Sequence, residues 1–374
     1  MANLSTKVLI ITPYRPPTIG GISTYIQTMD HELHRYGYTT RIIGFPPWLR
    51  KLENNARPRT FRFIHRISVI IFIIIGLAHI IYSRIFHKRV IISSHMTGFC
   101  LFIGVIGRVL GCNSVHTFHR YLEKRSISIE ILSSKVDMIV FISKYQMLEF
   151  EKYFSIPNAK KTIIESGIDP KLYMKWTKGS RSDARKKLGL KLTEIVVLYI
   201  GRVAKEKGAD TLVQAFSDLT RIRKNTILLM VGPLENGQDF YVDKIRDDIE
   251  KKKLSKRVQL IGPIPPERLA YYFNAADIFV IPSRNEAFGL SALEAMSFKL
   301  PVIAADTGGL RDIIVEGETG FFFQADNADQ LINKLITLTD DDSLRNRLGN
   351  NGFIRQKKYF STEKMILKYI NIFE

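Results

Sequence analysis

The stretch PSRNEAFGLSALEAMSFKLPVIAADTGG, residues 282–309, carries the most specific pattern in the chain. It contains two glutamates, Glu286 and Glu294, which are separated by seven residues. Glu286 follows an expected strand at residues 277–281, whose last four residues are apolar, and Glu294 lies in a helix expected to begin near Gly289. In open α/β sheets, ligands bind at the carboxyl ends of strands, where helix N-termini present unpaired N–H groups to anions. The pattern therefore predicts a ligand site at this strand–loop–helix junction.

A purely structural interpretation of these residues is also open. Ser291 and Glu294 have the spacing of a capping box, in which the glutamate would bond only to the end of its own helix. The structure can separate the two interpretations, because a capping box requires Ser291 to be the first, non-helical residue.

The quoted stretch closely resembles the donor-site signature of the family 4 retaining glycosyltransferases, the glycosyl transferases group 1 of the GT-B fold. The resemblance extends over most of the chain. It implies that Glu286 faces the transferred sugar and that Glu294 holds the ribose hydroxyls of the nucleotide. It also implies that the backbone N–H groups of Phe288, Gly289 and Leu290 contact the sugar and the phosphates.

The overall composition is that of an ordinary globular protein with two domains. A chain of 374 residues is long for a single core. Only two cysteines occur, Cys100 and Cys112, so we expect neither a disulfide framework nor a zinc site, and a reducing cytoplasm fits. The first residues lead into a strand without the basic and apolar regions of a secretory signal, so export is not expected.

The net charge of +19 is concentrated in the first half of the chain. Residues 1–176 hold 24 Lys and Arg against 10 Asp and Glu, and residues 50–89 hold nine basic residues against the single acid Glu53. Such a surface suits nucleic acid, anionic lipid or a phosphorylated substrate, or it is only solvated. Charge alone does not choose among these partners.

The most hydrophobic run, Ile67–Tyr82, lies within this basic region. At ~1.5 Å per residue its sixteen uncharged positions make a helix of roughly 24 Å, shorter than the ~30 Å hydrocarbon core of a bilayer. A spanning helix is therefore not favoured. Two interpretations remain open: a helix buried in the first domain, or an interfacial helix whose basic neighbours bind anionic headgroups. The helix-like stretch 99–110 is open to the same two interpretations.

The first domain contains a second candidate anion site. A strand at residues 7–12 leads through Gly20 and Gly21 into a helix, and glycines at a helix N-terminus let the backbone approach a phosphate. The resemblance places this glycine pair beside the donor diphosphate and the acceptor. A strand at residues 114–118 is followed by His119, which the resemblance places close to the sugar. We favour His119 over His116, which should point the opposite way along the strand.

A second alternating series of strands and helices follows a basic stretch, residues 175–187, that is expected to be the linker. A strand at residues 195–200 leads into a glycine-bounded loop, residues 201–208, which carries Arg202 and Lys207. Cations in such a loop are well placed to neutralise a diphosphate. The resemblance assigns both side chains to the donor phosphates.

These observations predict an α/β protein of GT-B fold, with two Rossmann-like doubly wound parallel-sheet domains that face each other across a cleft. The first domain is expected at residues 1–173, with the C-terminal helix 362–374 as a candidate addition, and the donor domain at residues 174–361. The absence of a Gly-x-Gly-x-x-Gly motif counts against a nicotinamide enzyme.

The resemblance implies a retaining glycosyltransferase that moves a sugar from a UDP- or GDP-sugar to a hydroxyl of a lipid-linked or glycan acceptor, in polysaccharide or glycolipid assembly. His119, Glu286, Arg202 and Lys207 are the expected catalytic residues. With these cations present we expect no metal and no cofactor. The alternatives are another GT-B enzyme, such as a nucleotide-sugar epimerase or a glycogen-synthase-like enzyme, or a basic nucleic-acid-binding protein.

No signature of nucleic-acid recognition occurs, so nucleic acid is not an expected partner. We expect a monotopic, peripheral enzyme on the cytoplasmic face of a membrane, with an anionic membrane surface as its partner. This expectation rests on the apolar run beside the basic residues, because attachment to a membrane accounts for both features.

Overall fold

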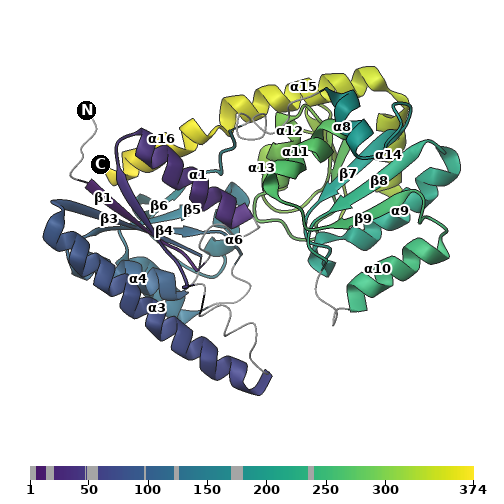
Figure 1. Ribbon diagram of the computed structural model, residues 1–374. Helices are drawn as coiled ribbons and strands as arrows, with labels where there is room; N and C mark the ends of the chain where they lie inside the picture. The colour runs from purple at the N-terminus through teal and green to yellow at the C-terminus, as the bar shows by residue number, and fades with distance from the viewer. Residues whose placement is uncertain are drawn as a thin grey trace. The chain divides into compact units, whose positions relative to one another are not determined.

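The computed structural model describes residues 6–13, 21–46, 48, 58–96, 98–121, 126–169, 180–234 and 240–374. The chain forms two compact units, Met1–Gly167 with Thr362–Glu374, and Ile168–Ser361 (Figure 1). The chain passes into the second unit after Gly167, six residues before the boundary expected from the sequence.

The first unit is a doubly wound parallel sheet with the strand order β2-β1-β3-β4-β5-β6. Its last strand, β6, has only three residues and was not expected from the sequence. The elements are β1 (Thr6–Ile11), α1 (Gly21–Arg35), β2 (Thr39–Ile43), α3 (Pro58–Phe86), β3 (Arg89–His95), α4 (Gly98–Val109), β4 (Asn113–Phe118), α5 (Ile127–Lys135), β5 (Met138–Phe141), α6 (Lys144–Glu151), the 3₁₀ helix η1 (Asn158–Lys160), β6 (Lys161–Ile163) and α16 (Thr362–Phe373).

Helices cover both faces of this sheet (Figure 1). Successive residues of β1 enter different clusters: Val8 and Ile10 pack with α1 and α16, whereas Leu9 and Ile11 pack with α3 and α4. All four side chains are fully buried. A parallel strand that is covered on both faces has a continuous apolar sequence, which explains why β1 does not alternate with polar residues.

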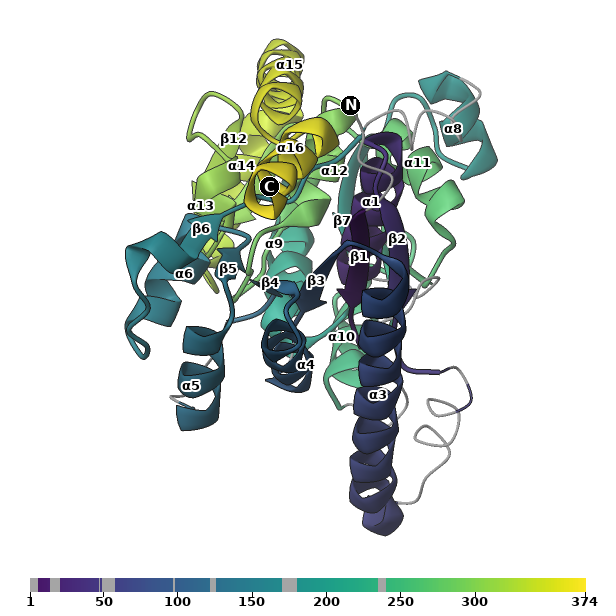
Figure 2. The same ribbon diagram turned by 90° about the vertical axis from the view of Figure 1, so that its left-hand side faces the viewer.

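Helix α3 is longer than the apolar run that predicts it (Figure 2), and its apolar side chains lie both inside the unit and on its surface. Phe72 and Ile80 are fully buried in the unit, whereas Ile70, Ile74 and Ile81 are 57%, 59% and 54% exposed. The interpretation of this helix as core alone is therefore wrong. By length and composition, residues 63–86 also suffice to cross a bilayer, but one side of the helix already packs on the first sheet.

The second unit is also a doubly wound parallel sheet, with the strand order β12-β11-β10-β7-β8-β9. This is the order of the dinucleotide-binding fold, whereas the first sheet has the other common doubly wound order. The elements are α8 (Arg181–Lys187), β7 (Ile195–Ile200), the 3₁₀ helix η2 (Lys205–Lys207), α9 (Ala209–Ile222), β8 (Thr226–Val231), α10 (Phe240–Lys251), β9 (Val258–Gly262), α11 (Pro266–Ala275), β10 (Ile278–Ile281), α12 (Leu290–Ser297), β11 (Val302–Ala305), α13 (Leu310–Ile313), β12 (Gly320–Phe323), α14 (Ala328–Asp340) and α15 (Asp342–Tyr359).

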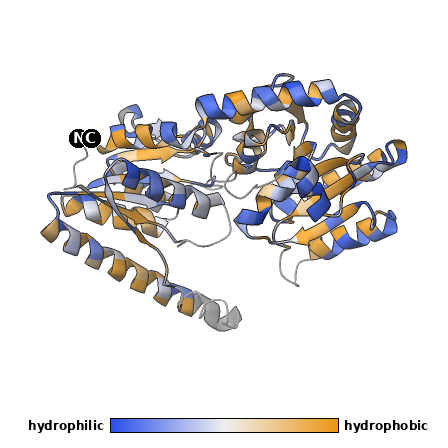
Figure 3. Cartoon of the chain, turned by 45° about the horizontal axis from the view of Figure 1, so that its top comes forward, coloured by the Kyte–Doolittle hydropathy of each residue, from blue (hydrophilic) through white to orange (hydrophobic). Residues whose placement is uncertain are grey.

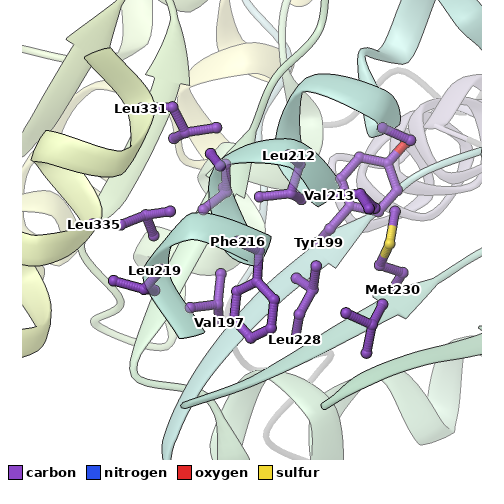
Figure 4. Packing of buried hydrophobic residues seen from close by; sticks show 14 of the residues in the cluster. Val197, Tyr199, Leu212, Val213, Phe216, Leu219, Leu228, Met230, Leu331 and Leu335 are labelled. Atoms are coloured by element: carbon purple, nitrogen blue, oxygen red, sulfur yellow. The ribbon is translucent and has the colours of Figure 1, made fainter. Parts of the chain in front are cut away.

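The core of the second unit is built where α9 packs on the sheet. Figure 4 shows Phe216 of α9 directed at Val197 of β7 and Leu228 of β8. All three side chains are fully buried, and α9 is strongly amphipathic, with Leu212 on the same covered face. This packing fixes the start of α9, and with it the loop that carries Arg202 and Lys207.

The prediction that residues 175–187 form a linker is wrong for the second half of this stretch. Residues 181–187 are helix α8, which begins with a capping box between Ser180 and Asp183. Arg185 is 1% exposed, and its guanidinium lies 2.5 Å from the carboxylate of Asp277. Asp277 also accepts a hydrogen bond from the Val196 N–H at 2.7 Å, so this ion pair joins α8 to β7 and to the start of β10.

Candidate functional site

The predicted donor residues lie where the strand order of the second sheet reverses. From β7 the chain proceeds to β8 on one side, whereas β10 pairs with the other side of β7. The loops after β7 and β10 are residues 201–208 and 282–289. Ligands of doubly wound sheets bind at this switch point, outside the carboxyl ends of the strands.

Lys207 and Glu286 meet at this switch point. The Nζ atom of Lys207 in η2 lies 2.7 Å from Oε2 of Glu286, and both side chains are largely buried. The hydroxyl of Ser283 also donates to Glu286 Oε2, at 3.2 Å. Lys207 and Glu286, which were predicted from separate motifs 79 positions apart, therefore form an ion pair.

Arg202 lies on the same loop but has a different partner. Its exposed guanidinium forms an ion pair with Glu206, four residues later. Tyr199 at the end of β7 donates to the backbone carbonyl of Arg202 at 2.5 Å, which fixes the start of the loop. An exposed pair of this kind contributes about 0–1 kcal/mol.

Helix α12 begins directly after the loop at residues 282–289. Its N-cap is Gly289, whose φ of 106° lies in the region that favours glycine. A Cβ atom on Gly289 would also lie 2.5 Å from Leu310 Cδ2, so a larger residue does not fit. The capping-box interpretation of Ser291 and Glu294 is therefore wrong, because Ser291 is the second helical residue. Glu294 is on this helix and is 8% exposed.

The side chains next to this helix start have different exposures. Phe288 is 3% exposed and packs against Phe360, so only its backbone is suited to contact a ligand. Leu290 is the first helical residue and is partly exposed. The Ala292 N–H donates to the Gly289 carbonyl at 2.9 Å, and the N–H groups before it lie at the positive end of the helix dipole.

The Thr307–Gly309 turn is tied to the loop at residues 282–289 by one backbone hydrogen bond and one side-chain hydrogen bond. The N–H of Gly309 donates to the carbonyl of Glu286 at 2.9 Å, and the hydroxyl of Thr307 donates to the carbonyl of Ser283 at 2.9 Å. A Cβ atom on Gly309 would lie 2.4 Å from the Ala287 carbonyl oxygen. Glycine is therefore required for this close approach, which fixes the backbone of Glu286.

Sequence analysis missed Arg284, which joins the two loops. Its guanidinium donates to both carboxylate oxygens of Asp210 at 2.9 Å, pairs with Asp326 at 2.7 Å and also donates to the Lys205 carbonyl. Its backbone N–H donates to the Glu206 carbonyl at 2.9 Å. Burial lowers the pKa of Arg284, but the hydrogen bonds to Asp210 and Asp326 outweigh this and hold the pKa above its ordinary value. Arg284 lies within residues 282–309, two residues before Glu286. That position was the one sequence feature that could have predicted its role in the site.

The remaining predicted residues belong to the first unit. Gly21 is the exposed first residue of α1, and Gly20 lies outside the described residues. His116 is fully buried in β4 and is hydrogen-bonded to Ser94 at 2.8 Å. His119 follows β4 and keeps 6% exposure. Burial lowers the pKa of His119 to about 3, so its ring is neutral at neutral pH.

Within the described ranges, no group of three or more His, Cys, Asp or Glu side chains has the arrangement of a metal site. Each predicted donor residue of the second unit lies in or directly beside the two switch-point loops, apart from Glu294, which is one helical turn further on. Two doubly wound domains, one of which has a cation, a carboxylate and a helix N-terminus at its switch point, are the arrangement expected for the GT-B class of glycosyltransferases.

Comparison with known proteins agrees with this class. Residues 180–355 match the family described as Glycosyl transferases group 1, and residues 19–172 match Glycosyltransferase Family 4. The first match lies within the second unit, and the second match covers most of the first unit and ends just past Gly167. The chain therefore belongs to this family of glycosyltransferases, as the resemblance of residues 282–309 predicts.

Individual relatives differ in how much of their length is matched. A D-inositol 3-phosphate glycosyltransferase of Corynebacterium glutamicum is 31% identical over 62% of this chain, and the match spans 55% of that relative. A GDP-mannose-dependent monoacylated alpha-(1-6)-phosphatidylinositol monomannoside mannosyltransferase of the same species is 26% identical over 99% of this chain and 98% of its own length. The solved structure of sucrose-phosphate synthase from Thermosynechococcus elongatus matches with a TM-score of 0.81 at 22% identity, over 98% of each chain, and it supports the fold.

Proposed function

We propose that the chain is a retaining glycosyltransferase that moves a sugar from a UDP- or GDP-sugar to an acceptor hydroxyl. The observation that carries this proposal is the 2.7 Å contact between Lys207 Nζ and Glu286 Oε2 at the switch point. Cleavage of the donor leaves negative charge on the diphosphate and builds positive charge on the sugar. A site for this reaction needs a cation and a carboxylate side by side, as Lys207 and Glu286 are.

Each group has a distinct role in this proposal. Lys207 leaves Glu286 and pairs with the leaving diphosphate, and Arg202 leaves Glu206 to become a second counter-charge. The N–H groups at Phe288, Gly289 and Leu290 bind the phosphates and the sugar. Glu286 then faces the sugar, and Glu294 holds the ribose. Because fixed protein cations neutralise the diphosphate, the proposed reaction needs neither a metal nor a cofactor.

The acceptor is proposed to be lipid-linked, or a glycan in polysaccharide or glycolipid assembly. The full-length match to a mannosyltransferase that is named for a monoacylated phosphatidylinositol mannoside supports this choice. Membership of the family supports retention of the anomeric configuration. In this proposal His119 of the first unit faces the transferred sugar, and the Gly20–Gly21 segment lies beside the donor diphosphate and the acceptor.

Thermal unfolding with a panel of UDP- and GDP-sugars tests the donor proposal. A ligand at 100 times its dissociation constant stabilises a protein by about 2.7 kcal/mol, so the true donor should raise the melting temperature clearly. The rise should be equal in EDTA and in Mg²⁺. If no nucleotide sugar raises it, the donor proposal is wrong.

We expect Glu294→Gln to weaken donor binding by about tenfold, the loss of one charged hydrogen bond. The exposed Glu250→Gln is the control, and equal affinity in both variants would remove the ribose role.

The first unit is proposed to attach to the cytoplasmic face of a membrane. Apolar side chains are exposed on α3, α4 and α5, of which α4 contacts both of the others, and α3 is hydrophobic along most of its length (Figure 3). These side chains are Phe63, Ile67, Ile70, Ile74, Ile81, Tyr82, Ile85 and Phe86 of α3, Phe102 and Val109 of α4, and Ile127 and Ile131 of α5. No Asp or Glu occurs between Glu53 and Glu123. A surface that is apolar and positive suits anionic lipid.

Flotation with vesicles of rising anionic lipid content tests the attachment. We expect wild type to float increasingly as anionic lipid is added. Changing Arg59, Arg62 and Arg66 to Ser should weaken binding by on the order of 100-fold, because each basic side chain near the surface contributes about 1 kcal/mol.

Two further variants separate the contribution of the apolar side chains to membrane binding from that of the basic side chains. Ile70, Ile74 and Ile81 changed to Ser should abolish flotation at every lipid composition. The control is Phe240→Ser, which removes an exposed aromatic side chain from the second unit. The attachment is disproved if wild type stays in solution at all compositions.

A further inference from the structure

Two histidines meet at the carboxyl edge of the first sheet. His95 is the last residue of β3 and pairs in register with Thr117 of β4, and His119 follows β4. Nδ1 of His95 lies 3.1 Å from Nε2 of His119. His95 is fully buried, and it lies at the switch point of this sheet, because the chain proceeds from β1 to β2 on one side and to β3 on the other.

Both imidazole rings are neutral, so only one of the two nitrogens in the His95–His119 hydrogen bond carries a hydrogen. Burial lowers the pKa of His119 to about 3, and burial followed by the proximity of His119 and His116 lowers the pKa of His95 well below its ordinary value. A neutral imidazole has one N–H donor and one bare acceptor nitrogen. One of the two rings must therefore donate and the other accept, and the tautomer of His119 is coupled to that of His95.

Ser93 extends the contact on the far side of His95. Its hydroxyl oxygen lies 3.0 Å from His95 Nε2, and a hydroxyl can donate or accept. If Ser93 donates, His95 donates to His119 Nε2, and His119 carries its hydrogen on Nδ1. If Ser93 accepts, each bond reverses, and Nδ1 of His119 becomes an acceptor. The number of protons is the same in both states.

The orientation of His119 is fixed by neighbouring aromatic side chains. The ring of Tyr25 of α1 packs edge-on against the ring of His119, with centroids 4.7 Å apart. The hydroxyl of Tyr25 lies 2.6 Å from that of Tyr369 of α16, which is 2.8 Å from Thr117 Oγ1. All these side chains are buried. Within the described part of the chain, no residue is hydrogen-bonded to Nδ1 of His119, so this nitrogen is the one available to a ligand.

We infer that His95 is a positioning residue that sets whether Nδ1 of His119 donates to, or accepts from, a hydroxyl of the bound sugar. The Ser93–His95–His119 relay lets one uncharged ring serve either role, because the bond directions reverse together. This inference rests on the proposed function, in which His119 faces the transferred sugar. It adds a residue that acts only through His119 and does not itself touch the ligand.

Kinetics of two His95 variants give the first test. His95→Phe keeps a ring but removes the bond to His119. We expect kcat to fall about fivefold to tenfold, the contribution of one neutral hydrogen bond, with less than about a twofold change in the donor KM. His95→Asn should restore most of kcat, because its amide group reaches the position of Nδ1. An unchanged kcat in His95→Phe would contradict the inference.

Ring ¹⁵N NMR of His119 gives the second test and requires no sugar transfer. We expect the ratio of the two neutral tautomers to change in His95→Phe and in Ser93→Ala, a smaller change that preserves the packing. Ser94→Ala is the matched control, because Ser94 is bonded to His116 instead. The same ratio in wild type and in both test variants would overturn the coupling. A wild type that transfers no sugar would overturn the proposed function but leave the tautomer result standing.

Discussion

Lys207→Ala is expected to lower sugar transfer by about 100-fold or more, because it removes one charge that stabilises the transition state. The same change leaves the carboxylate of Glu286 without its cation at 2.7 Å. The loss should appear in kcat and in kcat/KM, since the interaction with the diphosphate strengthens as the bond breaks. Steady-state kinetics with the donor found by thermal protection is the measurement.

Lys205→Ala is the matched control for this change. Lys205 is in the same 3₁₀ helix, but its side chain is exposed, and its known partner, Arg284, binds its backbone carbonyl. We expect Lys205→Ala to retain nearly full activity. Arg202→Ala should resemble Lys207→Ala, with a loss on the order of 100-fold. Wild-type turnover in both Arg202→Ala and Lys207→Ala would remove the phosphate role from this loop.

Arg185→Leu should destabilise the second unit by about 3 kcal/mol or more, because it removes the buried partner of the Asp277 carboxylate, which then keeps only the exposed Arg181 as a counter-charge. Arg185 also donates to the backbone carbonyls of Ala275, Lys191, Leu192 and Glu194. Hydrogen exchange of the β7 and β10 amides reports on this unit alone, and we expect both strands to lose protection.

Arg181→Ala provides the comparison for this prediction. Arg181 pairs with the same carboxylate, that of Asp277, but its side chain is 52% exposed. Exposed pairs contribute about 0–1 kcal/mol, so protection should change little. If Arg181→Ala and Arg185→Leu have equal effects, burial is not the cause of the expected loss.

Local patterns in the sequence predict most of the strands and the donor junction. The apolar run before Glu286 and the glycine before α12 suffice to predict strand, loop and helix there. The bounds of the other strands depend on pairing with strands that are distant in the sequence. Strand β2 begins at Thr39, ahead of its apolar residues, because Thr39 pairs in register with Lys7 of β1. The three-residue strand β6 has no apolar alternation of its own, and it exists because β5 supplies its hydrogen bonds.

The sequence predicts which residues belong to the site, but it does not predict which of them contact one another. Glu286, Lys207 and Arg202 could be selected from their motifs, whereas the contact of Lys207 with Glu286 and the pairing of Arg202 with Glu206 required coordinates. His95 and Arg284 were missed for a related reason. Each acts through residues that are distant in sequence, His119 and Asp210, so neither forms a local motif.

The return of α16 to the first unit has a consequence for biosynthesis. Met365, Ile366, Tyr369 and Phe373 of α16 are part of the core that contains Val8 and Ile10. The whole of the second unit, Ile168–Ser361, separates α16 from the rest of that core. A ribosome that adds ~5–20 residues per second needs roughly 10–40 s for this segment. During that time the nascent first unit exposes the hydrophobic surface on which α16 later packs, whereas the second unit can fold as soon as it has emerged.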